Sequence, residues 1–198
     1  MKKTIEDPTQ INWAARQRAA LIRFEVINGR PVNPREKTGR TGQGDLWHWG
    51  EQVCADAIVT AFTETGRALL MVERDDGHGW ALPGGTVGPD ETAAAAAVRE
   101  LAEETGLRLP GPGWQALPAR YVPDPRASDE AWMVTVPHRA HLGRLRHADL
   151  PVVVGADDAR RAAWIPADTY AGLAAHLASA YRGQVFAAHQ PMLAELLG

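Results

Sequence analysis

The chain has 198 residues, of which 45% are hydrophobic, and it carries a formal net charge of −3 at pH 7. This length can bury one substantial core, while the small acidic charge and the absence of a long lysine or arginine run exclude a broad nucleic-acid or anionic-membrane surface. Cys54 is the only cysteine, so an intrachain disulfide is excluded and the chain fits a reducing compartment.

The first residues do not follow the pattern of a secretory signal. Lys2 and Lys3 are followed by Glu6 and Asp7, where a signal peptide would need an apolar stretch. No segment of the sequence is long and apolar enough to suggest a membrane span. We therefore predict a cytoplasmic protein with no membrane partner.

Residues 1–50 are predicted to form a small N-terminal part that packs on the core. Apolar residues at helical spacing predict a short helix over 11–22. Residues 24–27 are expected to form a strand before a turn at 28–29. Residues 31–50 are rich in Gly, Pro, Arg and Thr, which predicts an extended loop.

Residues 51–198 are predicted to form the main domain. Helical apolar spacing predicts two C-terminal helices, over 170–181 and 185–197. Helices that flank a mixed sheet would make an α/β/α sandwich, within the α/β class. Six segments have the composition of strands: residues 57–62, 68–73, 80–82, 119–122, 131–136 and 162–165.

Three carboxylates carry the strongest chemical signal. Glu100, Glu103 and Glu104 are spaced so that on a helix they project from one side. Their like charges repel one another, and carboxylate oxygens grouped without Cys or His suit a hard divalent cation, Mg²⁺ or Mn²⁺. The ordinary alternative for such a cluster is a solvated helix face.

The residues around these acids predict the limits of that helix. Asp90 is expected to cap its start, beside Glu91, and Gly106 to stop it. Arg99 lies four residues before Glu103, so it can hold a carboxylate or offset the charge of the cluster. An apolar stripe at helical spacing is expected to pack on the sheet, and it consists of Ala94, Ala97, Val98 and Leu101.

Three features of this segment match a known pattern together. They are the spacing from Gly85 to Glu91, the spacing from Glu91 to Arg99, and the terminal Gly-Leu pair at 106–107. In this combination the segment resembles a Nudix box. The resemblance implies a Nudix-type α/β/α sandwich with a mixed β-sheet and a catalytic loop-helix-loop. Glu91 and Arg99 are expected to form an ion pair that locks the loop onto the helix, a supporting role.

The resemblance to the Nudix family also implies roles for individual residues. The metal ligands would be the carbonyl of Gly85 with Glu100, Glu103 and Glu104. Glu100, which follows the arginine, is the leading candidate for the general base. Arg99, Glu100, Glu103 and Glu104 would together form the catalytic set. For Arg99 a purely structural part is the open alternative.

Segments outside the box are similar to the ADP-ribose pyrophosphatase branch of the family. That likeness implies metal-dependent hydrolysis of ADP-ribose to AMP and ribose 5-phosphate, with a small-molecule substrate and no nucleic-acid partner. The state of assembly is left as monomer or homodimer. The matching segments occur in the same order as in that branch, at residues 39–42, 49–50, 56–60, 80–85, 121–126, 131–133, 156–159 and 186–189.

The same likeness places three residues at the substrate. Asp124 and Arg126 would face the nucleotide, because an arginine suits phosphate and a carboxylate suits ribose hydroxyls. Phe186 would stack on adenine or ribose, at a position where the branch commonly has Tyr. The alternatives are a surface turn with a local ion pair and an ordinary core aromatic.

Two other functions stay open. Val53 stands where the branch usually has His, and the N-terminal part is short, so another nucleoside diphosphate derivative is an alternative substrate. A non-catalytic ADP-ribose sensor is the alternative from a different class. The intact acids at Glu100, Glu103 and Glu104 favour the enzyme.

Overall fold

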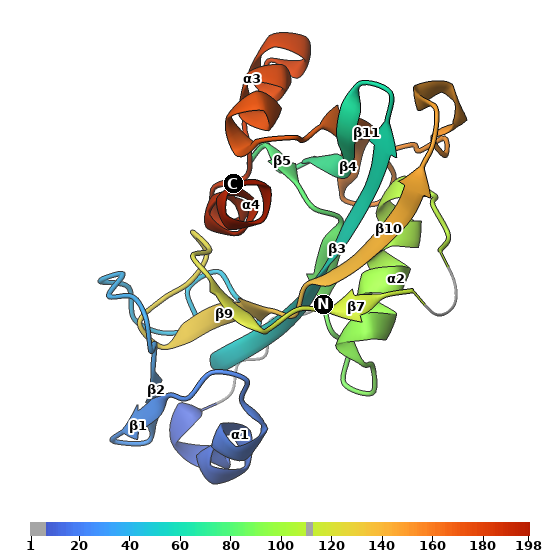
Figure 1. Ribbon diagram of the computed structural model, residues 1–198. Helices are drawn as coiled ribbons and strands as arrows, with labels where there is room; N and C mark the ends of the chain where they lie inside the picture. Colours follow the sequence, from blue (N-terminus) through green and yellow to red (C-terminus); the bar gives the residue numbers. More distant parts are fainter. Residues whose placement is uncertain (1–6, 110–112) are drawn as a thin grey trace. The chain divides into compact units, whose positions relative to one another are not determined.

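The computed structural model describes residues 7–109 and 113–198 (Figure 1). The chain divides into two compact units. One unit combines the described residues up to Cys54 with Pro118–Val136, and the other combines Ala55–Leu117 with Pro137–Gly198. The domain division predicted at residue 50 stays a prediction.

The first unit combines short helices with short strands. A 3₁₀ turn, η1 (Pro8–Gln10), precedes helix α1 (Trp13–Ala19). The helix is shorter than the predicted 11–22 at both ends, and its start is fixed by the side chain of Asn12, which caps it. Strand β1 (Glu25–Ile27) pairs antiparallel with β2 (Arg30–Val32), so a strand occupies part of the expected loop.

The first part of β3 (Gly50–Thr63) organises the rest of this unit. It pairs parallel with β9 (Ala131–Thr135), which pairs antiparallel with β8 (Arg120–Val122). An aromatic core lies beside these strands and contains Trp13, Phe24, Trp49, Trp132 and Val134. The edge-to-face contacts of Phe24 with Trp13 and Trp132 join the helix to the strands.

The second unit is built on a mixed sheet with strand order β11-β4-β3-β10-β7. Strands β3 and β10 are parallel, and the other neighbours in this order are antiparallel. The short strands β5 (Trp80–Ala81) and β6 (Gly84–Thr86) pair with β4 and β3. The remaining strands are β4 (Gly66–Arg74), β7 (Gln115–Ala116), β10 (His138–Arg144) and β11 (Ala159–Pro166).

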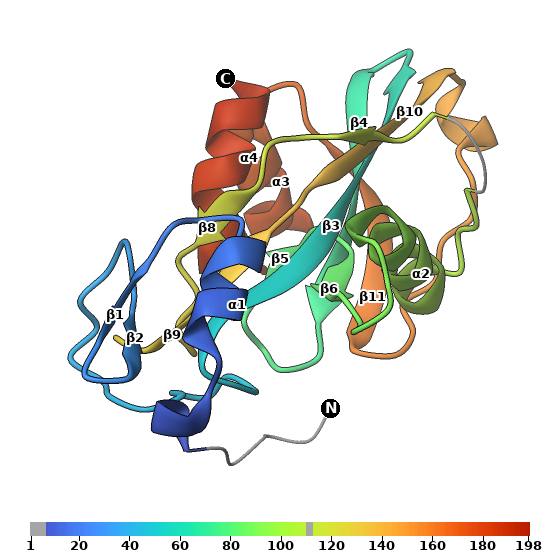
Figure 2. The same ribbon diagram turned by 90° about the horizontal axis from the view of Figure 1, so that it is seen from below.

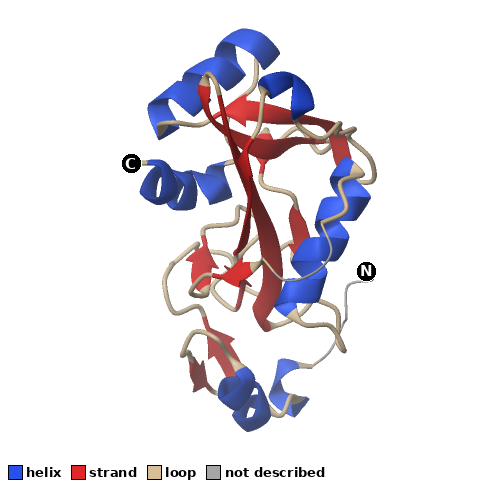
Figure 3. Ribbon diagram, turned by 45° about the vertical axis from the view of Figure 1, so that its right-hand side comes forward, coloured by secondary structure: helices blue, strands red, loops and turns tan. Residues whose placement is uncertain are grey.

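Helices cover both faces of this sheet, as Figures 2 and 3 show. Helix α2 (Ala93–Thr105) packs on Ala57 and Val59, whereas α3 (Tyr170–Tyr181) and α4 (Gln190–Leu197) pack on the face that carries Ile58. Successive residues of a strand point to opposite faces of the sheet. Because helices cover both faces, β3 carries apolar residues on both. The predicted α/β/α sandwich is confirmed.

Several boundaries differ from the predictions. Strand β10 was not predicted, and the last helix begins at Gln190 instead of 185, because residues 187–189 form the 3₁₀ turn η3 (Ala187–His189). A further 3₁₀ turn, η2 (His147–Asp149), follows β10. Among the described residues, no helix combines the length and apolar character needed to cross a bilayer.

Candidate active site on helix α2

Helix α2 begins two residues later than its acidic flank suggested. Thr92 is its N-cap, with Oγ1 accepting a hydrogen bond from the N–H of Ala95 at 3.2 Å. The prediction that Asp90 caps the helix is therefore wrong. Residues 88–91 instead form a turn in which the N–H of Glu91 bonds to the carbonyl of Gly88. The predicted stop is confirmed, since Gly106 has φ 72° in the left-handed region.

The buried face of α2 decides how exposed each glutamate is. Ala96, Ala97 and Leu101 are fully buried against the sheet, while Ala94, predicted to belong to this stripe, is exposed. The stripe is rotated toward the acidic side of the helix. As a result Glu104 is only 7% exposed, whereas the side chain of Glu103 is 46% exposed.

Arg99 joins the loop to the helix through several carboxylates. Its Nε and Nη2 donate to the two oxygens of Glu91, each at 2.9 Å, so the expected ion pair is present and bidentate. Nη1 donates to Glu100 at 2.7 Å and to Glu103 at 2.9 Å. Nη2 also reaches the carbonyl of Thr86 at 3.1 Å. These hydrogen bonds raise the pKa of Arg99, which therefore stays charged.

Glu104 closes the other end of the cluster. Its Oε2 accepts a hydrogen bond of 2.9 Å from the N–H of Gly84 in β6. Burial raises the pKa of Glu104 to about 8, and the nearby charge of Glu100 adds to this shift. Burial also raises the pKa of Glu100. Two carboxylates thus lie in an environment that disfavours negative charge.

Gly85 brings its backbone close to the carboxylate of Glu100. A Cβ on Gly85 would lie 2.3 Å from Oε1 of Glu100, so no larger residue fits without moving that side chain. Among the residues that the structure describes, no three acidic, histidine or cysteine side chains converge closely enough to enclose a metal ion. Arg99 contacts Glu100 and Glu103 instead. The donor set itself, carboxylates in a partly desolvated cradle, fits a hard divalent cation.

A buried histidine supports the loop that precedes Gly85. Nδ1 of His189 accepts a hydrogen bond of 3.1 Å from the N–H of Leu82, so in the neutral ring Nε2 carries the proton. Nε2 lies 3.6 Å from Oδ1 of Asp56, and a Cβ on Gly84 would lie 2.4 Å from the same oxygen. The sequence alone predicted no role for Asp56 or His189, although both lie in segments that resemble the family.

The other sequence-predicted residues of this unit lie near these elements. Phe186 is 5% exposed, and the guanidinium of Arg74 lies 4.8 Å from its ring centroid. Asp157 and Asp158 form a turn, with φ 53° at Asp157. This turn lies near α2, since the N–H of Ala156 bonds to the carbonyl of Glu104.

Asp124 and Arg126 belong to the first unit and contact each other. The guanidinium donates from Nε to Oδ1 at 2.9 Å and from Nη2 to Oδ2 at 2.7 Å, while the N–H of Arg126 donates to Oδ1 at 2.8 Å. The side chain of Asp124 is 2% exposed and that of Arg126 is 36% exposed. One edge of the arginine is therefore occupied, and these three hydrogen bonds brace the turn between the two residues.

A comparison of the sequence with protein-family models identifies the family of this chain. The sequence matches the model of the NUDIX domain over residues 52–187, which is more than half of the chain. The chain belongs to the Nudix family, as the box resemblance indicated.

Individual relatives narrow the comparison. The chain is 30% identical over 173 residues to the mitochondrial ADP-ribose pyrophosphatase of Rattus norvegicus, an alignment that covers 72% of this chain and 49% of the rat protein. It is 30% identical over 170 residues to the transient receptor potential cation channel subfamily M member-like 2 of Nematostella vectensis, covering 71% of this chain and 11% of the channel. The chain thus spans about half the length of the rat protein and about a tenth of the length of the channel.

A solved structure shows the same fold. The bifunctional NMN adenylyltransferase/ADP ribose pyrophosphatase of Francisella tularensis, complexed with AMP and a Mn ion, superposes with a TM-score of 0.53 at 26% identity. The superposition covers 76% of this chain and 43% of that chain. The matched part is therefore a Nudix-type sandwich in both proteins.

Proposed function

We propose that this chain is a divalent-metal-dependent Nudix pyrophosphohydrolase that cleaves ADP-ribose to AMP and ribose 5-phosphate. The observation that carries the proposal is the arginine-organised set of carboxylates on α2, with Gly85 against Glu100 and Gly84 bonded to Glu104. The choice of ADP-ribose is supported by the rat relative and by the solved bacterial neighbour, both of which carry an ADP-ribose pyrophosphatase name.

The metal ligands in this proposal are Glu100, Glu103 and Glu104 with the carbonyl of Gly85. Mg²⁺ is the proposed ion, and Mn²⁺ is the alternative that the bacterial neighbour holds. When bound, a divalent cation neutralises charge on the phosphate oxygens and lowers the pKa of water. Arg99 and the N–H of Gly84 donate to these carboxylates and offset part of their charge, and a bound cation would offset more.

The chain's own residues supply positioning and proton transfer. Arg99 holds the loop against the helix through Glu91 and orients Glu100 and Glu103. Glu100, which follows Arg99, is the proposed general base, and burial raises its pKa above its ordinary value. Asp124, Arg126 and Phe186 are the proposed substrate contacts, with Arg126 on phosphate and Phe186 on adenine or ribose.

The test is turnover by the purified chain with Mg²⁺ or Mn²⁺, with ADP-ribose beside NADH, nucleoside triphosphates and other diphosphate sugars, and products resolved by chromatography. Selective release of AMP and ribose 5-phosphate is the expected result. Glu100→Gln and Glu104→Gln should each lower kcat by roughly 100-fold or more. Glu25→Gln, an exposed glutamate of β1, is the matched control.

Other results would change the proposal in defined ways. Faster turnover of another nucleoside diphosphate derivative would keep the chemistry and replace the substrate. Tight ADP-ribose binding without product would favour the non-catalytic sensor, a reading prompted by the channel relative. Near-normal turnover by both glutamine variants, with circular dichroism unchanged, would refute the assignment of the metal site.

A further inference from the structure

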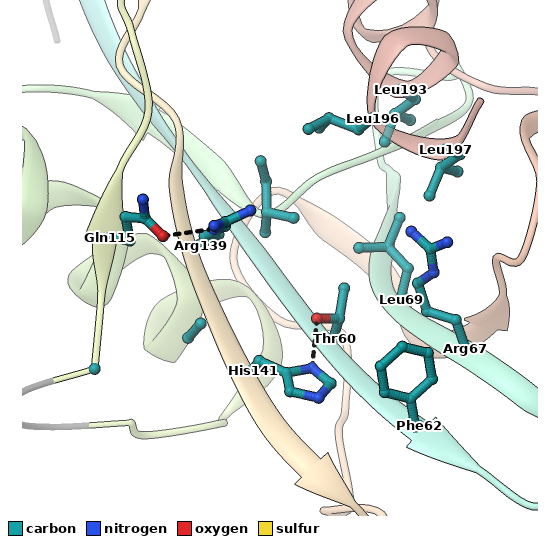
Figure 4. A pocket seen from close by; sticks show the side chains of 13 residues that line it. Thr60, Phe62, Arg67, Leu69, Gln115, Arg139, His141, Leu193, Leu196 and Leu197 are labelled. Atoms are coloured by element: carbon teal, nitrogen blue, oxygen red, sulfur yellow. Dashed lines mark hydrogen bonds between the residues drawn. The ribbon is translucent and has the colours of Figure 1, made fainter.

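A separate hollow lies in the second unit, on the face of the sheet that carries α3 and α4. It is a half-open groove of about 430 Å³ between the end of α4 and strands β3, β4 and β10 (Figure 4). A volume of this size is in the range of small-molecule sites. Helix α2 packs on the other face of the sheet. None of the residues that line the groove belongs to the glutamate cluster of α2.

One part of the groove is apolar. Leu193, Leu196 and Leu197 line it from α4, and Ile58 and Leu69 line it from the sheet. The three leucines lie together on the helix side of the groove in Figure 4. Together they can cover a hydrocarbon chain, which gains free energy by leaving water.

The groove extends to an apolar side chain that is poorly covered. Phe62 is 41% exposed, which makes it one of the few large hydrophobic residues on the described surface. Its ring contacts His141 edge to face, with the ring centroids 5.1 Å apart. Because Phe62 also lines the groove, its ring adds to the apolar wall.

The polar part of the groove contains two permanently charged arginines and one histidine. Its lining contains Arg67, Arg139 and His141 and no aspartate or glutamate. Two of these three already have partners, since Nε of Arg139 donates to Gln115 at 2.8 Å and Nδ1 of His141 bonds to Thr60 Oγ1 at 3.0 Å. The groove thus has an excess of positive charge next to its apolar wall.

Arg67 is the cation that lacks such a bond. Its Nε is buried and has no hydrogen-bond partner among the described residues. Leaving a buried donor of a charged group unpaired costs free energy, which a ligand that accepts its hydrogen bond would recover. In Figure 4 the guanidinium points along the groove toward Leu197. An arginine fork matches the two oxygens of a carboxylate, and such charge-assisted bonds are strong.

We propose that this groove binds a small amphipathic carboxylate, of the medium-chain fatty-acid type. The carboxylate bonds to the guanidinium of Arg67, and the hydrocarbon chain lies on Leu193, Leu196 and Phe62. The site is distinct from the α2 cluster and independent of the hydrolytic function proposed above. Its ligand is recognised by the combination of one anionic head and one apolar chain.

The test is isothermal titration calorimetry of the full chain with octanoate, 1-octanol, octylammonium and acetate. Octanoate should bind saturably at one site, and 1-octanol, octylammonium and acetate should each bind at least about tenfold more weakly. Arg67→Gln should weaken octanoate binding about tenfold without affecting 1-octanol. Leu196→Ser should weaken both ligands. Arg160→Gln, an exposed arginine outside the groove, should leave octanoate binding unchanged.

Three results would overturn the proposal. These are the absence of saturable octanoate binding to the folded chain, equal affinity for octanoate and 1-octanol, and octanoate binding that Arg67→Gln leaves intact. Arg67→Lys provides a check on folding, because it keeps the charge and most of the side-chain packing. If octanoate binding were instead lost in Glu100→Gln and kept in Arg67→Gln, the ligand would belong to the α2 cluster and not to the groove.

Discussion

The backbone N–H of Gly84 donates a hydrogen bond of 2.9 Å to the buried carboxylate of Glu104. Despite this bond, burial raises the pKa of Glu104 from its ordinary value of 4.5 to about 8. The site therefore holds a carboxylate that takes up a proton when no cation is bound. This property has a measurable effect on stability.

The metal-free protein should lose stability as the pH rises from about 4.5 to about 8. In this window the unfolded chain has released the proton of Glu104 while the native state still holds it, so native protein binds more protons and raising the pH favours unfolding. Below the window both states are protonated, and above it both are ionised, so this contribution then stays constant.

Thermal unfolding in chelator at several pH values measures this effect. Glu104→Gln should flatten the decline of Tm across the window, because glutamine does not titrate. Adding Mg²⁺ should raise Tm more at pH 8 than at pH 5 in the wild-type chain, since the ionised carboxylate is the ligand. A wild-type Tm that rises from pH 5 to pH 8 in chelator, together with an identical rise in Glu104→Gln, would contradict the prediction.

Arg99→Lys should damage both stability and activity. A lysine keeps the charge but cannot make the two bonds to Glu91 while it also contacts Glu100 and Glu103. Because Arg99 is 36% exposed, solvent screens part of the loss, and we expect about 1 kcal/mol, or a Tm lower by about 2–4 °C. We also expect kcat/KM to fall about tenfold or more. Arg23→Lys on the exposed surface is the control.

The two glycines of β6 should respond differently to alanine. On Gly84 a Cβ would lie 2.6 Å from the backbone carbonyl of Ala55 and 2.4 Å from Asp56, which cannot move freely because it is buried. On Gly85 the nearest atoms belong to the flexible end of Glu100. Gly84→Ala should therefore cost about 1–3 kcal/mol of folding free energy.

Gly85→Ala should instead keep a Tm within about 2 °C of the wild type and lose most activity, because the carboxylate of Glu100 is pushed aside. Differential scanning fluorimetry and the ADP-ribose assay, run on both alanine variants, separate the two effects. Equal activity of Gly85→Ala and the wild type would show that the position of Glu100 next to Gly85 is unimportant for catalysis.

How far the sequence predicts this structure depends on whether a feature is local. The stop of α2 at Gly106 and the Glu91–Arg99 ion pair follow from residues close in the chain, and the sequence predicts them correctly. The cap is misassigned because Asp90 and Thr92 are both good caps, and the tertiary position of Glu91, bonded to Arg99, selects Thr92.

Non-local features are harder to predict. Strand β10 has several charged and polar residues and little apolar alternation, and it forms through parallel pairing with β3. The bond between Leu82 and His189 joins residues 107 positions apart, and no spacing rule indicates it. The one indication in the sequence that this segment belongs to the functional region is the likeness of residues 186–189 to the family.

Arg126→Ala should raise the KM for ADP-ribose about tenfold or more and change kcat little, if Arg126 binds phosphate equally in the ground and transition states. The variant also removes two of the bonds to Asp124, whose side chain is 2% exposed, so it leaves a buried carboxylate with fewer donors. A fall in stability would therefore accompany any effect on binding. Asp124→Asn/Arg126→Ala removes that buried charge and should recover Tm, while its KM, which reports on both proposed substrate contacts, should stay at least as high as that of Arg126→Ala. Steady-state kinetics of both variants measure KM, and thermal unfolding measures their stability. A KM equal to that of the wild type in the double variant would show that the Asp124–Arg126 turn is only structural.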